Sequence, residues 1–395
     1  MAEQARQAVV EIATALASSP APEPREDDPT LASGAAGQAV LFAALAAVLP
    51  ELGHAERAVA LLDRAFDGIG AGGFGPELYA GYTGVGWAAE FLRGRLLASD
   101  EDHGADVDEA LDEVLSASPP PGAHDLVRGL VGLGVYARER LPAPAARRTL
   151  ERIVRHLGAM ARHEGPGCCW PAEDARVADV GVAHGTAGVV AFLAACWREG
   201  VSEARPLMDG AVSWLLAHRL PLDGETRFPA FVALRADGPP PKPTRSAWCY
   251  GDPGVALALL SAARATGDVS WEREALEAAR AAARRPMGHT QVVDAGLCHG
   301  AAGLGHLFHR LYQATGEDTF AHAARGWFTR TLAMRKPGEG IAGYLAFAPT
   351  HGSWHADPGL LTGAAGVALA LLSAAWPIPS SWDRMLLADL PLVAS

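Results

Sequence analysis

A short glycine motif repeats along the whole of this 395-residue chain. Seven times a Gly-x-x-Gly sequence leads into an apolar run, at intervals of 47 to 66 residues. The glycine pairs are Gly34/Gly37, Gly81/Gly84, Gly129/Gly132, Gly185/Gly188, Gly251/Gly254, Gly300/Gly303 and Gly363/Gly366. The nonapeptide VALALLSAA occurs verbatim at 255–263 and 367–375, each time directly after the second glycine. One such motif is a weak signal, but seven copies with the same continuation indicate a repeat architecture.

Each repeat predicts two helices of different character. The apolar runs, such as QAVLFAALAAVL from 38, are apolar on nearly every side, which is typical of buried helices. Charged, amphipathic stretches lie between them, such as AARRTLERIVRHLGAMAR from 145 and SWEREALEAARAAARR from 270. Two helices with their turns need about 40–50 residues, which matches the shortest intervals. The sequence therefore predicts an all-α fold: an α/α toroid of seven inner and seven outer helices, forming a single domain over 1–395.

Three intervals are longer because they carry Pro- and Gly-rich insertions, at 163–181, 221–244 and 337–358. Strand-like runs lie inside two of them, at Phe228–Leu234 and Ile341–Phe347. In a toroid the loops that lead into the inner helices share one rim. We therefore expect the short loop and strand insertions at one mouth.

Composition narrows the class of protein. With 49% hydrophobic and 20% charged residues the chain suits a large buried core and not a disordered state. A net charge of −12 does not favour a nucleic-acid partner. Five cysteines are too few and too scattered for a disulfide framework, and they fit a reducing compartment. The first 20 residues contain Glu3 and Glu11 and predict an amphipathic helix, not a signal peptide. No apolar run reaches the ~18 residues of a membrane span, so we expect a cytoplasmic protein.

Alignment of the repeats on their first glycine brings reactive side chains into one register. His184, Tyr250 and His299 directly precede that glycine in repeats four to six, and Cys249 and Cys298 stand one position earlier. Equivalent positions place these side chains at one mouth of the predicted toroid. Two thiolates and an imidazole form a three-ligand zinc site with an open fourth position. The alternative is that both cysteines are small buried residues, but their shared register favours a metal site.

Four further residues have two readings each. His184 is either a capping or core histidine, or a functional group in register with the ligands. Asp125, four residues before the glycine of its repeat, is either a helix N-cap or a partner that orients His184. Arg245 is either part of a surface salt bridge or an active-site cation. Tyr250 is either a core residue with a hydroxyl partner or a site residue.

Other candidate chemistry is weaker. Cys168 and Cys169 lie in an insertion, out of register with the glycine motifs, and we do not expect them to bind metal. The sequence has no P-loop, no strand-borne G-x-G-x-x-G, no HExxH and no G-x-S-x-G motif. A self-contained kinase or dehydratase half is therefore not expected.

Three segments carry a resemblance to a known family. AHGTAG (183–188), RSAWCYGDPG (245–254) and GLCHGAAG (296–303) resemble the motifs of LanC-like lanthipeptide cyclases, and the likeness runs from LASGAAG to LLTGAAG. The resemblance implies an α/α toroid that holds one zinc ion per chain at the positions matching Cys249, Cys298 and His299. The length of the chain leaves no room for appended dehydratase, kinase or lyase regions, so it resembles the stand-alone cyclases.

The resemblance also implies an activity. The family's acid/base histidine matches His184, and residues with supporting roles match Asp125, Arg245 and Tyr250. The implied reaction adds peptide cysteine thiolates to dehydroalanine or dehydrobutyrine and forms (methyl)lanthionine rings in a precursor peptide. Implied partners are this dehydrated peptide, a separate dehydratase and export machinery.

Other functions stay open at this point. One is addition of glutathione to dehydrated residues by a LanC-like enzyme. Another is a non-catalytic, zinc-stabilised peptide-binding scaffold in a lanthipeptide synthetase complex. Protein prenyltransferases also activate thiolates with zinc in an α/α barrel, but they resemble an Asp/Cys/His ligand set, and the seven glycine motifs disfavour them.

Overall fold

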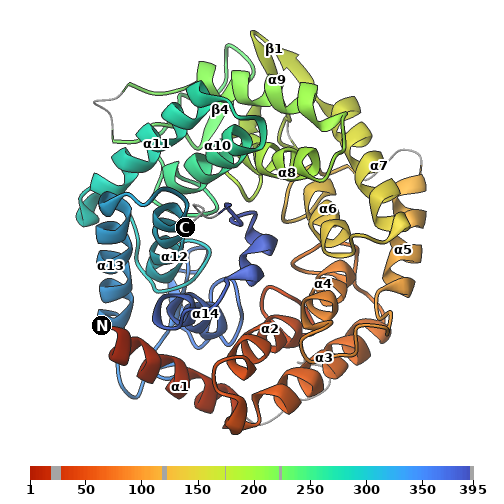
Figure 1. Cartoon of the computed structure of the whole chain (residues 1–395). Helices are drawn as coiled ribbons and strands as arrows, with labels where there is room; N and C mark the ends of the chain where they lie inside the picture. The colour runs from red at the N-terminus through yellow and green to blue at the C-terminus, as the bar shows by residue number, and fades with distance from the viewer. Residues whose placement is uncertain (19–27, 118–121, 174, 222–224, 392–395) are drawn as a thin grey trace. The chain divides into compact units, whose positions relative to one another are not determined.

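The structure is a computed structural model that describes residues 1–18, 28–117, 122–173, 175–221 and 225–391. Residue 174 of the first predicted insertion and residues 222–224 of the second lie outside the described residues. Within the described ranges the chain forms fourteen α-helices and a few three-residue strands (Figure 1). The helices alternate along the chain between two kinds.

The first kind begins directly after the first glycine of a repeat, and we call these the glycine-led helices. They are α2 (Ala35–Ala46), α4 (Tyr82–Leu92), α6 (Leu130–Glu139), α8 (Thr186–Arg198), α10 (Asp252–Thr266), α12 (Ala301–Thr315) and α14 (Ala364–Ala375). They are largely buried: in α2, for example, every residue from Ala35 to Leu45 is buried. The predicted helices with apolar residues on every side are confirmed.

The second kind is amphipathic. These helices are α1 (Ala2–Ser18), α3 (His54–Gly70), α5 (Ala105–Ser116), α7 (Pro144–Met160), α9 (Ala204–Ala217), α11 (Val269–Arg284) and α13 (Asp318–Ala333). In α7 the buried residues include Leu150, Ile153, Val154 and Leu157, which lie on one face at helical spacing. The predicted N-terminal amphipathic helix is confirmed as α1.

Both glycines of the motif allow the preceding loop to press against the helix start. The N–H of Ala35, which has no partner within the helix, donates to the carbonyl of Asp28 at 2.8 Å. A Cβ on Gly34 would lie 1.9 Å from that carbonyl oxygen, and a Cβ on Gly37 would lie 2.3 Å from the carbonyl oxygen of Leu31. The first N–H of α4, α6, α12 and α14 likewise donates to the carbonyl seven residues earlier. The repeated motif therefore specifies a repeated backbone cap.

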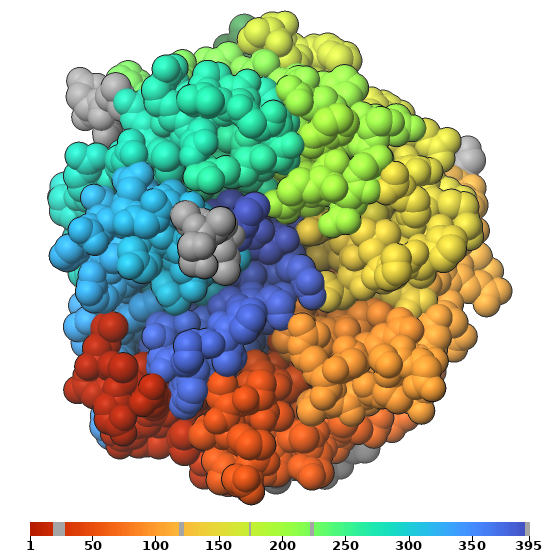
Figure 2. Space-filling model, viewed as in Figure 1, coloured from red at the N-terminus to blue at the C-terminus, as the bar shows by residue number. Residues whose placement is uncertain are grey.

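Two compact units can be distinguished within the chain. Unit 1 contains residues 1–109, 293–306 and 324–382, and unit 2 contains 110–292, 307–323 and 383–395. In unit 1, α2 packs against α3 and α4, and α14 packs against α1 and α2. Figure 2 shows the red α1 beside the dark blue C-terminal part of this unit. In unit 2, α8 packs against α6, α9 and α10, while α10 packs against α11 and α6 against α7. That the whole chain folds as one domain stays a prediction.

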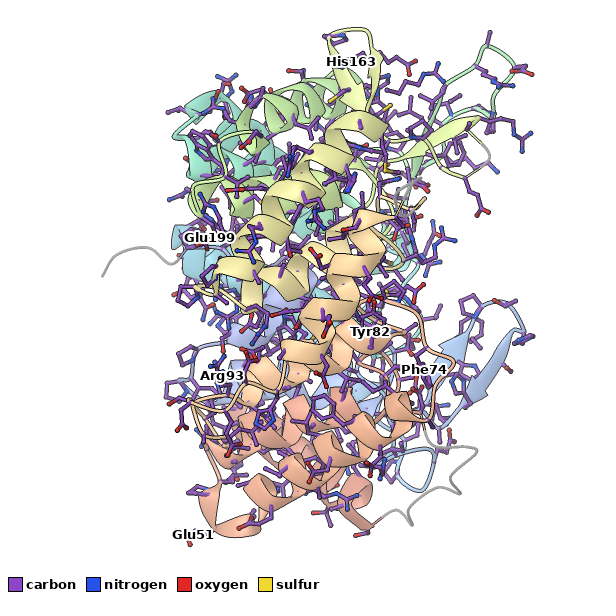
Figure 3. All side chains as sticks on the ribbon, turned by 90° about the vertical axis from the view of Figure 1, so that its right-hand side faces the viewer. Glu51, Phe74, Tyr82, Arg93, His163 and Glu199 are labelled. Atoms are coloured by element: carbon purple, nitrogen blue, oxygen red, sulfur yellow. The ribbon has the colours of Figure 1, made fainter. Side chains whose placement is uncertain are left out.

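In the described part of the chain, six short strands pair as three antiparallel ribbons. They are β1 (Arg162–Glu164) with β2 (Gly167–Cys169), β3 (Val177–Asp179) with β4 (Phe231–Ala233), and β5 (Ala346–Ala348) with β6 (Ser353–His355). The first ribbon follows α7 directly, and Figure 3 labels His163 within it. β4 lies inside the predicted run 228–234, and β5 overlaps the end of the predicted run 341–347. The other strands were not predicted. No helix in the described ranges is both long and apolar enough to cross a membrane.

Candidate metal centre and acid–base site

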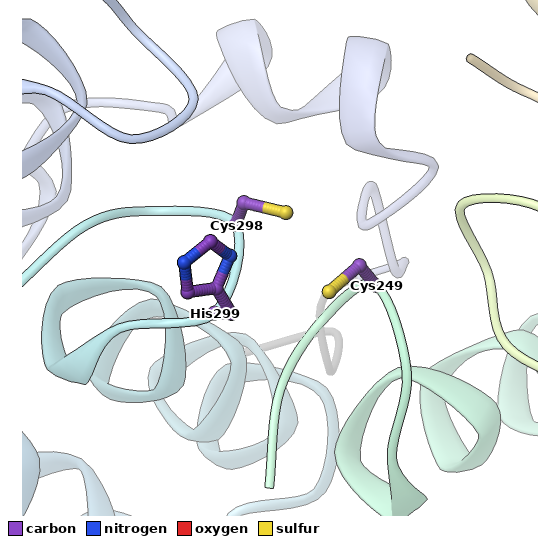
Figure 4. A group of neighbouring side chains, drawn as sticks. All are labelled: Cys249, Cys298 and His299. Carbon is purple, nitrogen blue, oxygen red and sulfur yellow. The ribbon is translucent and has the colours of Figure 1, made fainter. Parts of the chain in front are cut away.

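Three side chains form a group of possible metal ligands. Cys249, Cys298 and His299 each offer one ligand atom, and these atoms all lie within 4.8 Å of one another. Figure 4 shows this group of neighbouring side chains. Both thiols are free, with Cys249 buried and Cys298 half-buried. Two thiols and one imidazole match the donor set of zinc sites that keep a fourth position open.

A buried carboxylate lies behind the histidine of this group. Oδ2 of Asp294 is 3.8 Å from Nε2 of His299, and Asp294 is only 2% exposed. Asp294 accepts N–H groups from Gly296 at 3.3 Å and from Phe347 in β5 at 3.1 Å. Metal-binding histidines commonly direct their second ring nitrogen to a carboxylate, which fixes the ring orientation. Asp294 lies beside His299 at a distance that allows charge attraction but is too long for a hydrogen bond, and the sequence reasoning did not identify it.

A second polar cluster lies in unit 2 and is built on Asp125 and His184. Oδ1 of Asp125 accepts the N–H groups of Val127 at 2.8 Å and Arg128 at 2.7 Å. Its Oδ2 lies 3.2 Å from Nδ1 of His184. Asp125 thus closes a turn within the loop, and it is not the N-cap of α6, which begins two residues after Arg128. The structure brings Asp125 and His184 into hydrogen-bonding contact.

Electrostatics keep the Asp125 carboxylate charged. Burial opposes ionisation, but hydrogen bonds from His184 and from the Arg128 backbone hold the pKa of Asp125 below its usual range. Because an ionised Asp125 can only accept a hydrogen bond, Nδ1 of His184 carries a proton and donates to it, which leaves Nε2 as the nitrogen free for chemistry. His184 is about one quarter exposed, so this ring is accessible from solvent.

Tyr250 lies beside this pair. Its ring centroid is 6.0 Å from that of His184, with 29° between the two planes. The Tyr250 hydroxyl donates to the carboxylate of Asp179, the last residue of β3. Burial raises the pKa of Asp179, and burial together with the nearby Asp179 charge raises the pKa of Tyr250. Tyr250 therefore stays protonated near neutral pH. Asp179, which holds it, was also missed by the sequence reasoning.

A backbone hydrogen bond joins this cluster to one of the candidate ligands. The N–H of Ala183 donates to the carbonyl of Cys249 at 3.3 Å. In the sequence, His184 directly follows Ala183, and Tyr250 directly follows Cys249. The loop that carries the histidine therefore lies against the loop that carries the first thiol.

The remaining predicted residues differ in their surroundings. Arg245 is half-buried, and among the described residues its guanidinium makes no hydrogen bond or ion pair. Cys168 and Cys169 are buried in β2, where burial raises the pKa of their thiols to about 11 and about 12. Such thiols are largely unreactive near neutral pH, and they do not join the candidate metal group.

Comparisons with known proteins give the same fold. The family model described as lanthionine synthetase C-like protein matches residues 25–387. A solved structure titled nisin cyclase is similar with a TM-score of 0.73 at 17% identity, over 92% of this chain and 94% of that chain. An unsaturated glucuronyl hydrolase from Streptococcus agalactiae is similar with a TM-score of 0.52 at 9% identity, over 96% and 94% of the two chains.

The match to nisin cyclase confirms the predicted α/α-toroid fold class. The second similar structure has the same general fold, but its title names an enzyme with a different reaction. A shared fold therefore does not decide the chemistry, which depends on the side chains of the site.

Proposed function

Since this chain belongs to the lanthionine synthetase C-like family, we propose that it is a zinc-dependent cyclase that forms thioether rings in a peptide. It adds cysteine thiols of a precursor peptide to dehydroalanine or dehydrobutyrine and so forms lanthionine or methyllanthionine. The observation that supports this most is the grouping of Cys249, Cys298 and His299 within 4.8 Å. A donor set of this kind leaves a position for a substrate sulfur.

Cys249, Cys298 and His299 would hold the zinc ion. Bound there, zinc would lower the pKa of a coordinated substrate thiol, which is near 8.5 for free cysteine. Asp294 would favour one orientation of the His299 ring by charge attraction. Asp294 itself is tied to the backbone of the third insertion through Phe347.

His184 would supply the proton that completes the addition. The sulfur bonds to the β-carbon of the dehydrated residue, and the electrons of the double bond move toward the neighbouring carbonyl as an enolate. The α-carbon must then gain a proton. Because Asp125 occupies Nδ1 of His184, the proton is delivered from Nε2 of the doubly protonated ring, and the proton that the substrate thiol releases balances the one that the α-carbon gains.

Arg245 and Tyr250 would support the enolate. The Arg245 guanidinium has no hydrogen-bond or ion-pair partner among the described residues, so it is available to a developing negative oxygen. Tyr250 is held by Asp179 and lies along one side of His184. It would limit where the substrate backbone lies relative to the histidine.

The reaction defines the partners of the proposed cyclase. A dehydratase must act on serine or threonine residues first, because the acceptor is a dehydrated residue. Export machinery would act on the cyclised product, and we propose the cytoplasm as the location.

The test uses a synthetic peptide that contains one dehydroalanine and one cysteine. Addition within the peptide does not change its mass, so thiol alkylation followed by mass spectrometry counts the cysteines that remain. We expect the zinc-loaded protein to remove the alkylatable thiol, without adding glutathione when glutathione is present. A glutathione adduct as the main product would favour the glutathione-adding alternative. No reaction with zinc bound would favour a non-catalytic scaffold.

A further inference from the structure

A polar pocket in unit 2 is not used by the proposed reaction. It has a volume of about 420 Å³ and lies at the end of α11, next to the second insertion and the start of α10. These two helices pack against each other (Figure 1). The ionisable residues that line the pocket are Glu225, Arg227, Asp252, Glu277, Arg284, Arg285 and His289.

Arg285 is the member of this lining with unused hydrogen-bond donors. Its side chain is only 6% exposed, and its Nη1 donates to the carbonyl of Thr244 at 2.7 Å. Its Nε and Nη2 are buried and have no hydrogen-bond partner among the residues that the structure describes. These two N–H groups form one edge of the guanidinium, and their spacing matches the two oxygens of a carboxylate. Buried donors are normally paired, so this edge indicates a missing acceptor.

The chain's own Glu225 already stands near that edge. One oxygen of Glu225 lies 3.7 Å from Nη2 of Arg285, and the other lies 3.8 Å from Nδ1 of His289. Both distances allow charge attraction, but they are too long for hydrogen bonds. The Glu225 side chain is 56% exposed, so it can turn into water when another carboxylate arrives. Its position marks the place where the pocket attracts a negative group.

Other residues of the lining indicate a singly charged ligand. The Thr226 hydroxyl is buried, has no hydrogen-bond partner within the described part of the chain, and can donate to the same ligand. Asp252 is already satisfied by the N–H groups of Arg227 and Phe228, at 2.7 and 2.9 Å. Arg227 is paired with acidic residues of α11. The lining holds three acidic residues (Glu225, Asp252 and Glu277) and three arginines (Arg227, Arg284 and Arg285), so its formal charges balance, which favours a carboxylate over a doubly charged phosphate.

The pocket adjoins the segment that carries the candidate catalytic residues. Thr244, which Arg285 holds through its carbonyl, directly precedes Arg245. Asp252, which lines the pocket, comes two residues after Tyr250. A peptide anchored in the pocket would therefore be close in the fold to the loop 244–251.

We propose that this pocket binds a carboxylate of an acidic peptide, with the Nε and Nη2 edge of Arg285 as its main contact. The proposal rests on the proposed function, in which the substrate is a peptide. The carboxylate can come from an aspartate or glutamate side chain or from a peptide C-terminus, since both present the same pair of oxygens.

The test measures binding by fluorescence anisotropy with labelled octapeptides that contain neither cysteine nor dehydrated residues. One peptide amide has a single Asp, a second has Asn in its place, and a third has Asn with a free C-terminal carboxylate. We expect the Asp peptide to bind at least about tenfold more tightly than the Asn amide, because a bidentate Arg–carboxylate pair is among the stronger polar contacts. Tight binding of the third peptide would identify the C-terminus as an equivalent source.

Three variants locate the contact. Arg285→Lys keeps the positive charge but loses the planar pair of N–H donors. It should weaken binding of the Asp peptide about tenfold. Glu225→Gln removes the competing carboxylate from an exposed position and should strengthen binding about threefold. Arg280→Lys is the matched control, because Arg280 lies on α11 and already pairs with Glu317. It should leave binding unchanged.

Several outcomes would overturn the proposal. These are equal binding of the Asp and Asn amides, no gain from Glu225→Gln in a folded protein, or displacement of the Asp peptide by inorganic phosphate at lower concentration than by acetate. The assay needs no turnover, so it can fail independently of the proposed function. If the protein forms thioethers but binds the Asp and Asn peptides equally, only the proposed carboxylate binding in the pocket is refuted. If the protein prefers the Asp peptide but forms no thioether, only the proposed cyclase function is refuted.

Discussion

The Nδ1 atom of His184 lies 3.2 Å from the Oδ2 atom of Asp125, whose other oxygen is fixed by two backbone N–H groups. The carboxylate is therefore held in place by its own loop before it contacts the imidazole. This arrangement fixes the orientation of the ring and directs Nε2 away from the carboxylate. Because the contacts favour the ionised form of Asp125, the free energy of unfolding should depend on whether this carboxyl is ionised.

Asp125→Asn should lower the stability of the protein in a pH-dependent way. The folded-state pKa of Asp125 is below its usual value of about 3.9. Ionised Asp125 therefore adds stability above that unfolded-state value, and this contribution is lost as the pH falls through the folded-state pKa. Urea unfolding of wild type and variant should show a clear difference at pH 7 and a smaller one near pH 3. A difference that does not change with pH would contradict the assignment.

Asp179 should act as a positioning residue for Tyr250. Asp179→Ala removes the acceptor of the Tyr250 hydroxyl and should slow thioether formation about tenfold, which corresponds to the loss of about one hydrogen bond. Asp179→Asn keeps an acceptor and should restore most of the rate. Because burial raises the pKa of Asp179, its ionised form is unfavourable in the fold above the unfolded-state pKa. The Asn variant should thus be at least as stable as wild type at pH 7.

The control for Asp179 is Asp357→Ala. Asp357 also stands six residues before the first glycine of its repeat, and its carboxylate accepts the N–H of Gly359 at 2.7 Å. This variant should lower the melting temperature with little effect on the rate per folded molecule. If both variants lowered only stability, Asp179 would be a purely structural residue.

Zinc content should depend on the two cysteines that share a register. Cys249→Ala and Cys298→Ala each remove one of three proposed ligands, so metal analysis should show a sharp fall from one zinc per chain. Cys168→Ala is the control, since Cys168 is buried in β2 and lies outside the candidate metal group. It should keep its zinc. Full zinc retention in either ligand variant would remove that cysteine from the site.

Glycine-to-alanine substitutions should affect stability differently at a motif glycine and at an ordinary helix glycine. Gly34→Ala places a Cβ 1.9 Å from the Asp28 carbonyl oxygen and should destabilise the fold by about 1–3 kcal/mol through steric overlap. Gly158→Ala, in the last turn of α7, meets no atom within 4 Å and should stabilise it by about 0.5–1 kcal/mol. Chemical denaturation measures both. Equal effects would mean that the close carbonyl contact is unimportant.

The sequence predicted the helical architecture because its periodicity is long and repeated. Every glycine-led helix begins where the motif places it, and the apolar runs are buried as expected. The short ribbons were predicted only in part, because strands of three residues carry almost no periodicity. β4 and β5 fell near strand-like runs, whereas β1, β2, β3 and β6 had no such signal.

The grouping of Cys249, Cys298 and His299 could be predicted from their equivalent positions in the repeats, while metal binding by them stays a prediction. Asp179 and Asp294 could not be predicted that way, because their roles depend on tertiary partners, the hydroxyl of Tyr250 and the N–H of Phe347. One signal was available. Both stand six residues before the first glycine of their repeats, as do Asp28 and Asp357. The register alone does not distinguish a turn-forming aspartate from one that serves the site.

The most direct test of the account measures zinc content and thioether formation in the same sample of His184→Ala. Asp125 engages His184 outside the candidate ligand set, so the variant should keep one zinc per chain and its fold. Thiol alkylation and mass spectrometry over time should show cyclisation slowed by about 10²–10⁴-fold, the usual contribution of a general acid. A wild-type rate from the zinc-loaded variant would remove His184 from the mechanism. Loss of zinc would make His184 a fourth ligand and the site a closed, structural one.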